Sequence, residues 1–117
     1  FIMAAKVINY HSPDGKNTYE LTFTRESAEA TERNGFQIYE FSNGINPIKN
    51  TSALFYGAFI ARNKGISRKT VDDMLVHTEN KEGLIAALME MYANSIKALI
   101  ATDEEDKTAK NATWEIV

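Results

Sequence analysis

The middle of this chain reads LFYGAFIAR at residues 54–62, an almost entirely apolar stretch that decides the fold. A helix without a polar face normally lies at the centre of a hydrophobic core. The sequence therefore predicts a central helix with Pro47 in its first turn and Asn46 as its cap, apolar nearly all round over 51–63. Gly57 costs about 1 kcal/mol of helix propensity relative to alanine, so we expect a neighbouring element to pack closely against it.

Two short alternating segments precede this helix and predict an antiparallel β-hairpin. Residues 6–11 and 18–24 are rich in β-favouring side chains, and the second segment places its tyrosine, leucine and phenylalanine on one face. The SPDG sequence at 12–15 is a turn signal, because Pro fixes φ and Gly accepts a positive φ. Two strands alone are marginal in water, so the apolar face must pack on helices or on another subunit.

Capping residues indicate where a short helix begins and ends before the apolar stretch. Thr24 can cap a helix over 25–34, because its hydroxyl can accept a hydrogen bond from a first-turn N–H. Gly35 suits the left-handed position just past that helix, and Phe36 would then pack back onto the last turn. The sequence thus predicts a short helix before an irregular connector over 37–46.

Two further helices follow, and they complete the predicted α+β fold. Ser67 and Asn80 are the expected N-caps, and the second helix reaches about Thr102. We expect an N-terminal β-hairpin followed by about four helices, packed as one small, mainly helical domain over 3–102. Residues 103–117 are expected to form a polar, flexible C-terminal tail.

The bulk composition narrows the class of protein. The 117 residues suit one domain, and Met3 is the expected native start. A net charge of −3 argues against a nucleic-acid surface. The absence of cysteine excludes disulfides and thiolate chemistry and favours a reducing compartment. No apolar run approaches the ~18 residues of a membrane span.

The sequence carries no recognisable catalytic or metal-binding motif. His11 and His77 lie far apart and share no ligand spacing, and the acidic run at 103–106 lacks the alternation of a calcium loop. A nucleophile elbow and a glycine-rich phosphate loop are also missing. We therefore expect a protein that is not an enzyme, with no catalytic residues, no cofactor and no metal site.

The last helix has a wider apolar stripe than one neighbour requires, so part of it is expected to bind a partner. The candidate partner-binding residues are Leu84, Leu88, Met89, Met91, Tyr92 and Ile96.

A small basic cluster supports an alternative function as a DNA-binding regulator. Its members are Arg62, Lys64, Arg68 and Lys69. Residues 54–74 can be interpreted as a helix-turn-helix. Two acidic residues, Asp72 and Asp73, weaken this interpretation because they lie where phosphates would approach.

The order of these features resembles a family of small phage and prophage proteins of Gram-positive bacteria. The features are ERNGF at 32–36, LFYGAF at 54–59, a short helix after Lys64-Gly65 and a Leu- and Met-rich last helix. The resemblance covers about 6–101. The family is similar to the tail assembly chaperones of long-tailed, non-contractile phages.

This resemblance implies a non-enzymatic function in the cytoplasm of a bacterial host. Such chaperones coat the aggregation-prone tape measure protein, recruit tail tube protein and self-associate. The resemblance offers no catalytic residue and no membrane partner, so a homo-oligomer that binds these two tail proteins is expected.

Overall fold

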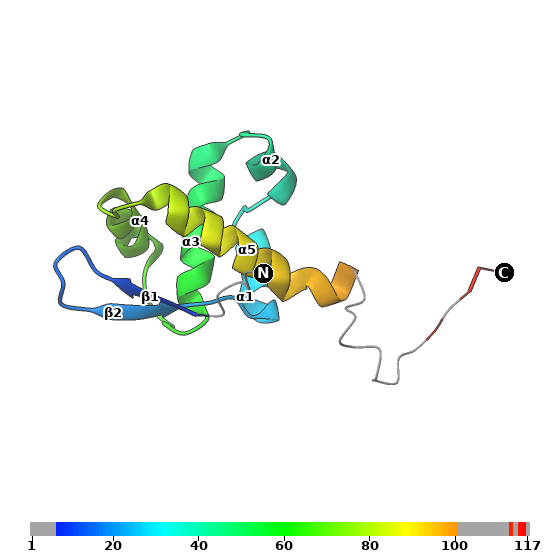
Figure 1. Ribbon diagram of the computed structural model, residues 1–117, viewed down its shortest axis with the longest axis horizontal. Helices are drawn as coiled ribbons and strands as arrows, with labels where there is room; N and C mark the ends of the chain where they lie inside the picture. Colours follow the sequence, from blue (N-terminus) through cyan, green and yellow to red (C-terminus); the bar gives the residue numbers. More distant parts are fainter. Residues whose placement is uncertain (1–6, 101–112, 114, 117) are drawn as a thin grey trace.

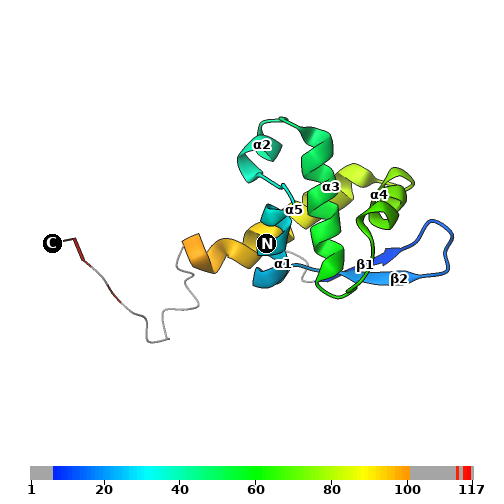
Figure 2. The same ribbon diagram turned by 180° about the vertical axis from the view of Figure 1, so that it is seen from behind.

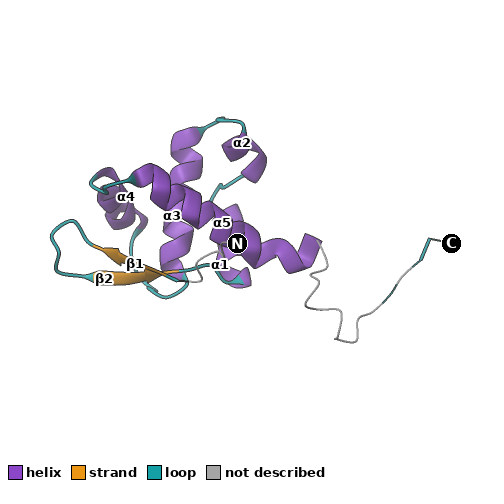
Figure 3. Cartoon of the chain, viewed as in Figure 1, coloured by secondary structure: helices purple, strands orange, loops and turns teal. Residues whose placement is uncertain are grey.

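The computed structural model describes residues 7–100, 113, 115 and 116. Figures 1 and 3 show an α+β fold, in which a two-stranded hairpin precedes the helices, as the sequence predicts. The elements are β1 (Ile8–His11), β2 (Thr18–Leu21), α1 (Arg25–Arg33), α2 (Ile38–Ser42), α3 (Pro47–Ile60), α4 (Arg68–Val76) and α5 (Lys81–Ile100). The predicted tail over 103–117 lies outside the described residues except at 113, 115 and 116.

Helix α3 is the centre of the fold, as its apolar sequence predicts. It contacts every other helix of the described chain and also β2. Figures 1 and 2 show α5 crossing one side of α3, while α1 and α4 flank it and the hairpin lies near its C-terminal end. Leu54, Phe55 and Phe59 are fully buried. Because α3 is enclosed on several sides, no face of it needs polar residues.

Gly57 marks the closest approach between α3 and α1. A Cβ atom at this position would lie 1.8 Å from the Thr31 hydroxyl oxygen and 3.2 Å from the Phe23 ring. Thr31 is fully buried, and its hydroxyl donates to the Ser27 carbonyl at 2.7 Å. The prediction of close packing at Gly57 is therefore confirmed.

The hairpin is antiparallel, with Ile8 opposite Leu21 and His11 opposite Thr18. Leu21 is fully buried, so the strand pair packs one face onto the helices. The Tyr10 ring makes edge contacts with Phe55 and Phe59 of α3, each at a centroid distance of 5.5 Å. These contacts give the hairpin the helical support that two strands need.

The capping predictions around α1 are confirmed. The Thr24 hydroxyl accepts from the Ser27 N–H at 3.1 Å, and the Ser27 hydroxyl accepts from the Thr24 N–H at 2.8 Å. At the other end, Gly35 has a φ of +107°, and its N–H donates to Glu32. The Phe36 N–H donates to the Thr31 carbonyl, which completes a Schellman motif with the Phe36 ring buried.

The prediction of an irregular connector over 37–46 was wrong, because this segment contains the five-residue helix α2. The fully buried amide of Asn50 holds the segment in place. It accepts from the Gln37 N–H at 2.8 Å and donates to the Asn46 carbonyl at 3.0 Å. Asn46 occupies the N-cap position of α3, as predicted, with a φ of +49°, but its side chain makes no capping hydrogen bond and donates to Glu40 instead.

The last two helices begin at their predicted caps. The Ser67 hydroxyl accepts from the Thr70 N–H at 3.1 Å, and the Asn80 side chain accepts from the Gly83 N–H at 3.3 Å. Helix α5 is described to Ile100, so the predicted end near Thr102 lies outside the described residues. None of the helices among the described residues has the length and apolarity that a membrane span requires.

Candidate functional site

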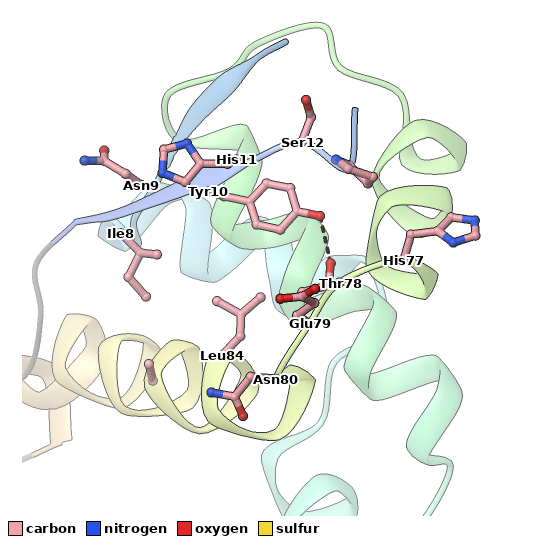
Figure 4. A pocket seen from close by; sticks show the side chains of 12 residues that line it. Ile8, Asn9, Tyr10, His11, Ser12, His77, Thr78, Glu79, Asn80 and Leu84 are labelled. Carbon is pink, nitrogen blue, oxygen red and sulfur yellow. Dashed lines mark hydrogen bonds between the residues drawn. The ribbon is translucent and has the colours of Figure 1, made fainter. Parts of the chain in front are cut away.

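The first candidate site, here called the edge groove, is a surface groove of about 530 Å³ beside β1. Residues 8–13 line one side, the α4–α5 loop over 77–80 lines the other, and Leu84 and Ala87 of α5 complete it. Figure 4 shows β1 and α5 on opposite sides of this space. No β2 residue lines it, so the groove follows the side of β1 that faces away from its partner strand.

A tyrosine fixes the geometry of the edge groove. The Tyr10 hydroxyl oxygen lies 2.7 Å from the Thr78 hydroxyl oxygen and donates to the Met74 carbonyl at 3.1 Å. Figure 4 shows the Tyr10 side chain extending from β1 to the α4–α5 loop. Since Thr78 also lies 2.7 Å from the Met74 carbonyl, the three oxygens form a closed set of contacts that holds the two sides of the groove together.

The hydrogen-bond pattern of the hairpin shows which backbone groups face the edge groove. The Ser12 N–H donates to the Asn17 carbonyl at 2.9 Å, so this pair is hydrogen-bonded. Bonded and non-bonded pairs alternate in an antiparallel ladder, which makes Tyr10 opposite Tyr19 a bonded pair. Asn9 and His11 therefore direct their N–H and C=O groups away from β2. Among the described residues, β1 has no strand on that side.

The outer edge of β2, in contrast, is covered. The Thr22 N–H donates to the Ala58 carbonyl at 3.1 Å, and the Asn63 side chain donates to the Glu20 carbonyl at 3.0 Å. Glu20 also accepts from Arg62 at 3.0 Å. Of the two edges of the described hairpin, β1 is the one that offers backbone groups to a further strand.

The second candidate site, here called the helix groove, lies between α3 and α4 and has a volume of about 590 Å³. Its apolar side chains come from Pro47 and Ile48 at the start of α3 and from Leu75 and Val76 at the end of α4. Ile48 is 86% exposed and Val76 is 65% exposed. Large apolar side chains that remain exposed together mark a candidate binding surface.

Charged side chains surround the helix groove, and three of the four are basic. Lys49, Arg68 and Lys81 line it together with Asp72. The Lys49 ammonium lies 2.9 Å from a Glu40 carboxylate oxygen. The hydrogen bond from Lys49 is the main reason why the pKa of Glu40 is lowered.

Two further charges at this rim, those of Arg68 and Asp72, are joined by one hydrogen-bonded chain. The Arg68 guanidinium donates to the Ser52 hydroxyl at 3.2 Å, and that hydroxyl donates to Asp72 at 2.6 Å. Asp72 of α4 thus has a partner on α3. Lys49, Arg68 and Asp72 are therefore positioned by the fold, and the lining has an excess of positive charge.

The structure divides the six predicted partner-binding residues between the core and the surface. Leu88, Met91 and Tyr92 are buried in the core. Leu84, Met89 and Ile96 are half-buried, and Leu84 lines the edge groove. Within the monomer, only these last three present surface to a partner, and partner binding by the set stays a prediction.

Tyr92 illustrates how closely the buried part of α5 is packed. Its ring makes edge contacts with Phe36 and Phe23, at centroid distances of 4.9 and 5.5 Å. Its hydroxyl donates to the Glu32 carboxylate at 3.3 Å. Burial, followed by the nearby Glu32 charge and this hydrogen bond, raises the pKa of Tyr92 to about 12.

This raised pKa predicts a loss of stability in alkaline solution. The unfolded chain loses the Tyr92 proton near pH 10, whereas the folded chain keeps it to about pH 12. Deprotonation therefore favours the unfolded state progressively across this interval. Chemical unfolding of the wild type and of Tyr92→Phe between pH 9 and 12 measures this loss of stability. If the free energy of unfolding fell equally with pH in both proteins, the expectation would be contradicted.

The structure also places the other sequence candidates. His11 and His77, which share no ligand spacing in the sequence, both line the edge groove. Within the described part of the chain, no three His, Asp or Glu residues gather as a group that could hold a metal ion. Of the basic cluster, Arg62 pairs with Glu20, and the Arg68 guanidinium lies 5.8 Å from the Tyr56 ring centroid. DNA binding stays a prediction.

The sequence indicated that two strands need further support, but it did not show that a groove would form beside β1. The edge groove is formed by β1 and a loop more than sixty positions later, and no local pattern connects them.

Comparisons with known proteins give one family. The family described as a domain of unknown function, DUF5055, matches residues 3–116. No match was found among curated proteins or among solved structures. Since the match spans almost the whole sequence, the chain belongs to the DUF5055 family.

Proposed function

We propose that this protein is a non-enzymatic phage tail assembly chaperone that binds the tape measure protein and helps tail tube assembly. The order of motifs supports this proposal through the resemblance described above. The structural observation that carries it is the helix groove, where Ile48 and Val76 are exposed on an apolar floor with a basic rim.

The shape and charge of the helix groove suit one kind of client, an amphipathic helix with acidic residues beside its apolar face. Such a helix would place apolar side chains at i, i+3 and i+4 between α3 and α4. Its carboxylates would lie near the rim cations Lys49, Arg68 and Lys81, which outnumber the two nearby carboxylates, Asp72 and Glu40. Complementary charge of this kind contributes more to selectivity and orientation than to affinity.

The expected strength of a single contact fits a chaperone that coats a long client. Burying one aliphatic side chain contributes about 1.5–3 kcal/mol, from which the entropy of association must be subtracted. A single groove of this size would therefore bind weakly and release readily. A long helical client offers many such segments, so several copies could bind side by side and keep it soluble.

The proposal is tested by co-expressing the wild type or the Ile48→Asp variant with the tape measure protein of the same phage and measuring how much of that client stays soluble. This change puts a charge on the apolar floor, and we expect it to reduce the soluble client by about tenfold. Because Ile48 is 86% exposed, the fold should retain its stability within about 0.5 kcal/mol.

Tyr39→Asp is the matched control. Tyr39 is 73% exposed on α2 and does not line the helix groove, so this variant should hold the client as the wild type does. Equal amounts of soluble client with wild type and Ile48→Asp would contradict the proposal, as would an equal loss with Tyr39→Asp. A shift of random duplex DNA at low salt would instead support the DNA-binding alternative.

A further inference from the structure

Residues 113–117 read TWEIV, a segment with strong β-strand character. Thr, Trp, Ile and Val all favour extended structure. In a strand, the alternation would place Trp114 and Ile116 on one face and Glu115 on the other. The DUF5055 match extends to residue 116, so most of this segment belongs to the pattern of the family.

The edge groove offers what a single added strand requires. Asn9 and His11 direct two N–H and two C=O groups toward it, which is the pattern that continues an antiparallel or parallel ladder. Ile8 and Leu84 provide a half-buried apolar floor for one face of the strand. The loop over 77–80 and α5 bound the far side, so the groove suits one strand rather than a second sheet.

We propose that residues 113–117 of a second copy of this chain add to β1 as a third strand in the edge groove. The backbone groups of Asn9 and His11 would bond to the added strand. Trp114 and Ile116 of that copy would cover the apolar floor. This inference concerns a different surface from the helix groove and does not depend on the proposed function.

The exposure of the segment within one chain favours a second copy as its source. Helix α5 begins beside the edge groove and runs about 24 Å from Leu84 to Ile100. Figure 1 shows its end on the side of the domain away from the hairpin. Ile116 is 88% exposed, so the chain does not cover this side chain itself. The twelve residues 101–112 can span up to about 40 Å, which would reach a neighbouring domain or the groove of the same chain, so it is the exposure of Ile116 that favours a second copy.

This arrangement has a consequence for assembly. Each chain would offer one segment and one groove. Reciprocal exchange between two chains would close a dimer, and exchange along a series of chains would give rings or open chains, so the mass should rise above that of the monomer with concentration.

The inference is tested by light scattering, which measures the association of the wild type and of the Asn9→Pro variant across a range of concentrations. Proline removes the outward N–H of Asn9 and leaves the β1–β2 ladder intact, because that N–H does not face β2. We expect the association constant to fall about tenfold or more. Asn9→Ala keeps the N–H and should associate as the wild type does. Deletion of 113–117 should abolish association.

Several results would overturn the inference. They are a wild type that stays monomeric at every concentration, equal association of the proline and alanine variants, and unchanged association after deletion of 113–117. Circular dichroism of each variant separates a lost contact from a lost fold.

Cross-linking identifies which segment occupies the groove, because the chain contains no cysteine of its own. A chain with Asn9→Cys and a second chain with Glu115→Cys are mixed and treated with a short bismaleimide. We expect a mixed cross-linked pair, and much less product when Lys69→Cys replaces Asn9→Cys as the exposed control. A product dominated by two Asn9→Cys chains would show edge-to-edge pairing, and no mixed product would exclude the proposed strand.

Discussion

Gly57→Ala is expected to lower the free energy of unfolding by about 3 kcal/mol, the upper range for an overpacked core. The added methyl group would lie 1.8 Å from the Thr31 hydroxyl oxygen and 3.0 Å from the Thr31 Cβ. Thr31 cannot move away easily, because it is fully buried and bonded to the Ser27 carbonyl. Helices α1 and α3 must therefore separate, which disturbs the core contacts on both. Urea unfolding followed by circular dichroism measures the loss.

A second substitution tests whether this contact is the cause. Thr31→Ala removes the hydroxyl that the new methyl group would strike, although the Cβ contact at 3.0 Å remains tight. The double variant Thr31→Ala/Gly57→Ala should therefore be more stable than the sum of the two single losses predicts, by about 1 kcal/mol or more. In an exposed helix, replacing Gly with Ala would instead raise stability by about 1 kcal/mol. A gain in the single variant would contradict the packing account.

The sequence was sufficient for those parts of the fold that depend on local chemistry. The Thr24 cap, the left-handed Gly35 and the apolar α3 each follow from interactions within a few residues. Helix α2 was missed for the opposite reason. Five residues carry little periodic signal, and the segment is held by the buried amide of Asn50 from the following helix. A contact of that kind has no signature in the segment itself.

The candidate sites were harder to predict, because each depends on elements that meet only in the fold. The apolar stripe of α5 was interpreted as too wide for one neighbour and therefore available to a partner. The stripe is wide because α5 packs against both α1 and α3, which bury Leu88, Met91 and Tyr92. The helix groove was missed because its exposed side chains, Ile48 and Val76, lie on different helices and each is unremarkable alone.

Leu88→Ala is expected to cost about 2–5 kcal/mol of unfolding free energy, because Leu88 is fully buried within the core cluster. The change removes three carbon atoms from a closely packed site, and the rigid aromatic neighbours of the cluster limit how far the core can collapse into the space. A thermal or urea unfolding curve measures the loss. A cost below about 1 kcal/mol would contradict the burial of this side chain.

Met89→Ala is the matched control for Leu88→Ala, since the next residue on α5 is only half-buried. Its truncation should cost clearly less stability, and the two variants together separate a core function from a partner function. A residue that binds a partner through its exposed surface loses association when truncated but keeps most of its stability. We therefore expect Leu88→Ala to act on stability, whereas any contribution of this part of α5 to partner binding should appear at Met89 or Leu84. Loss of association at Leu88 with unchanged stability would require that α5 turn this face outward in the assembled protein.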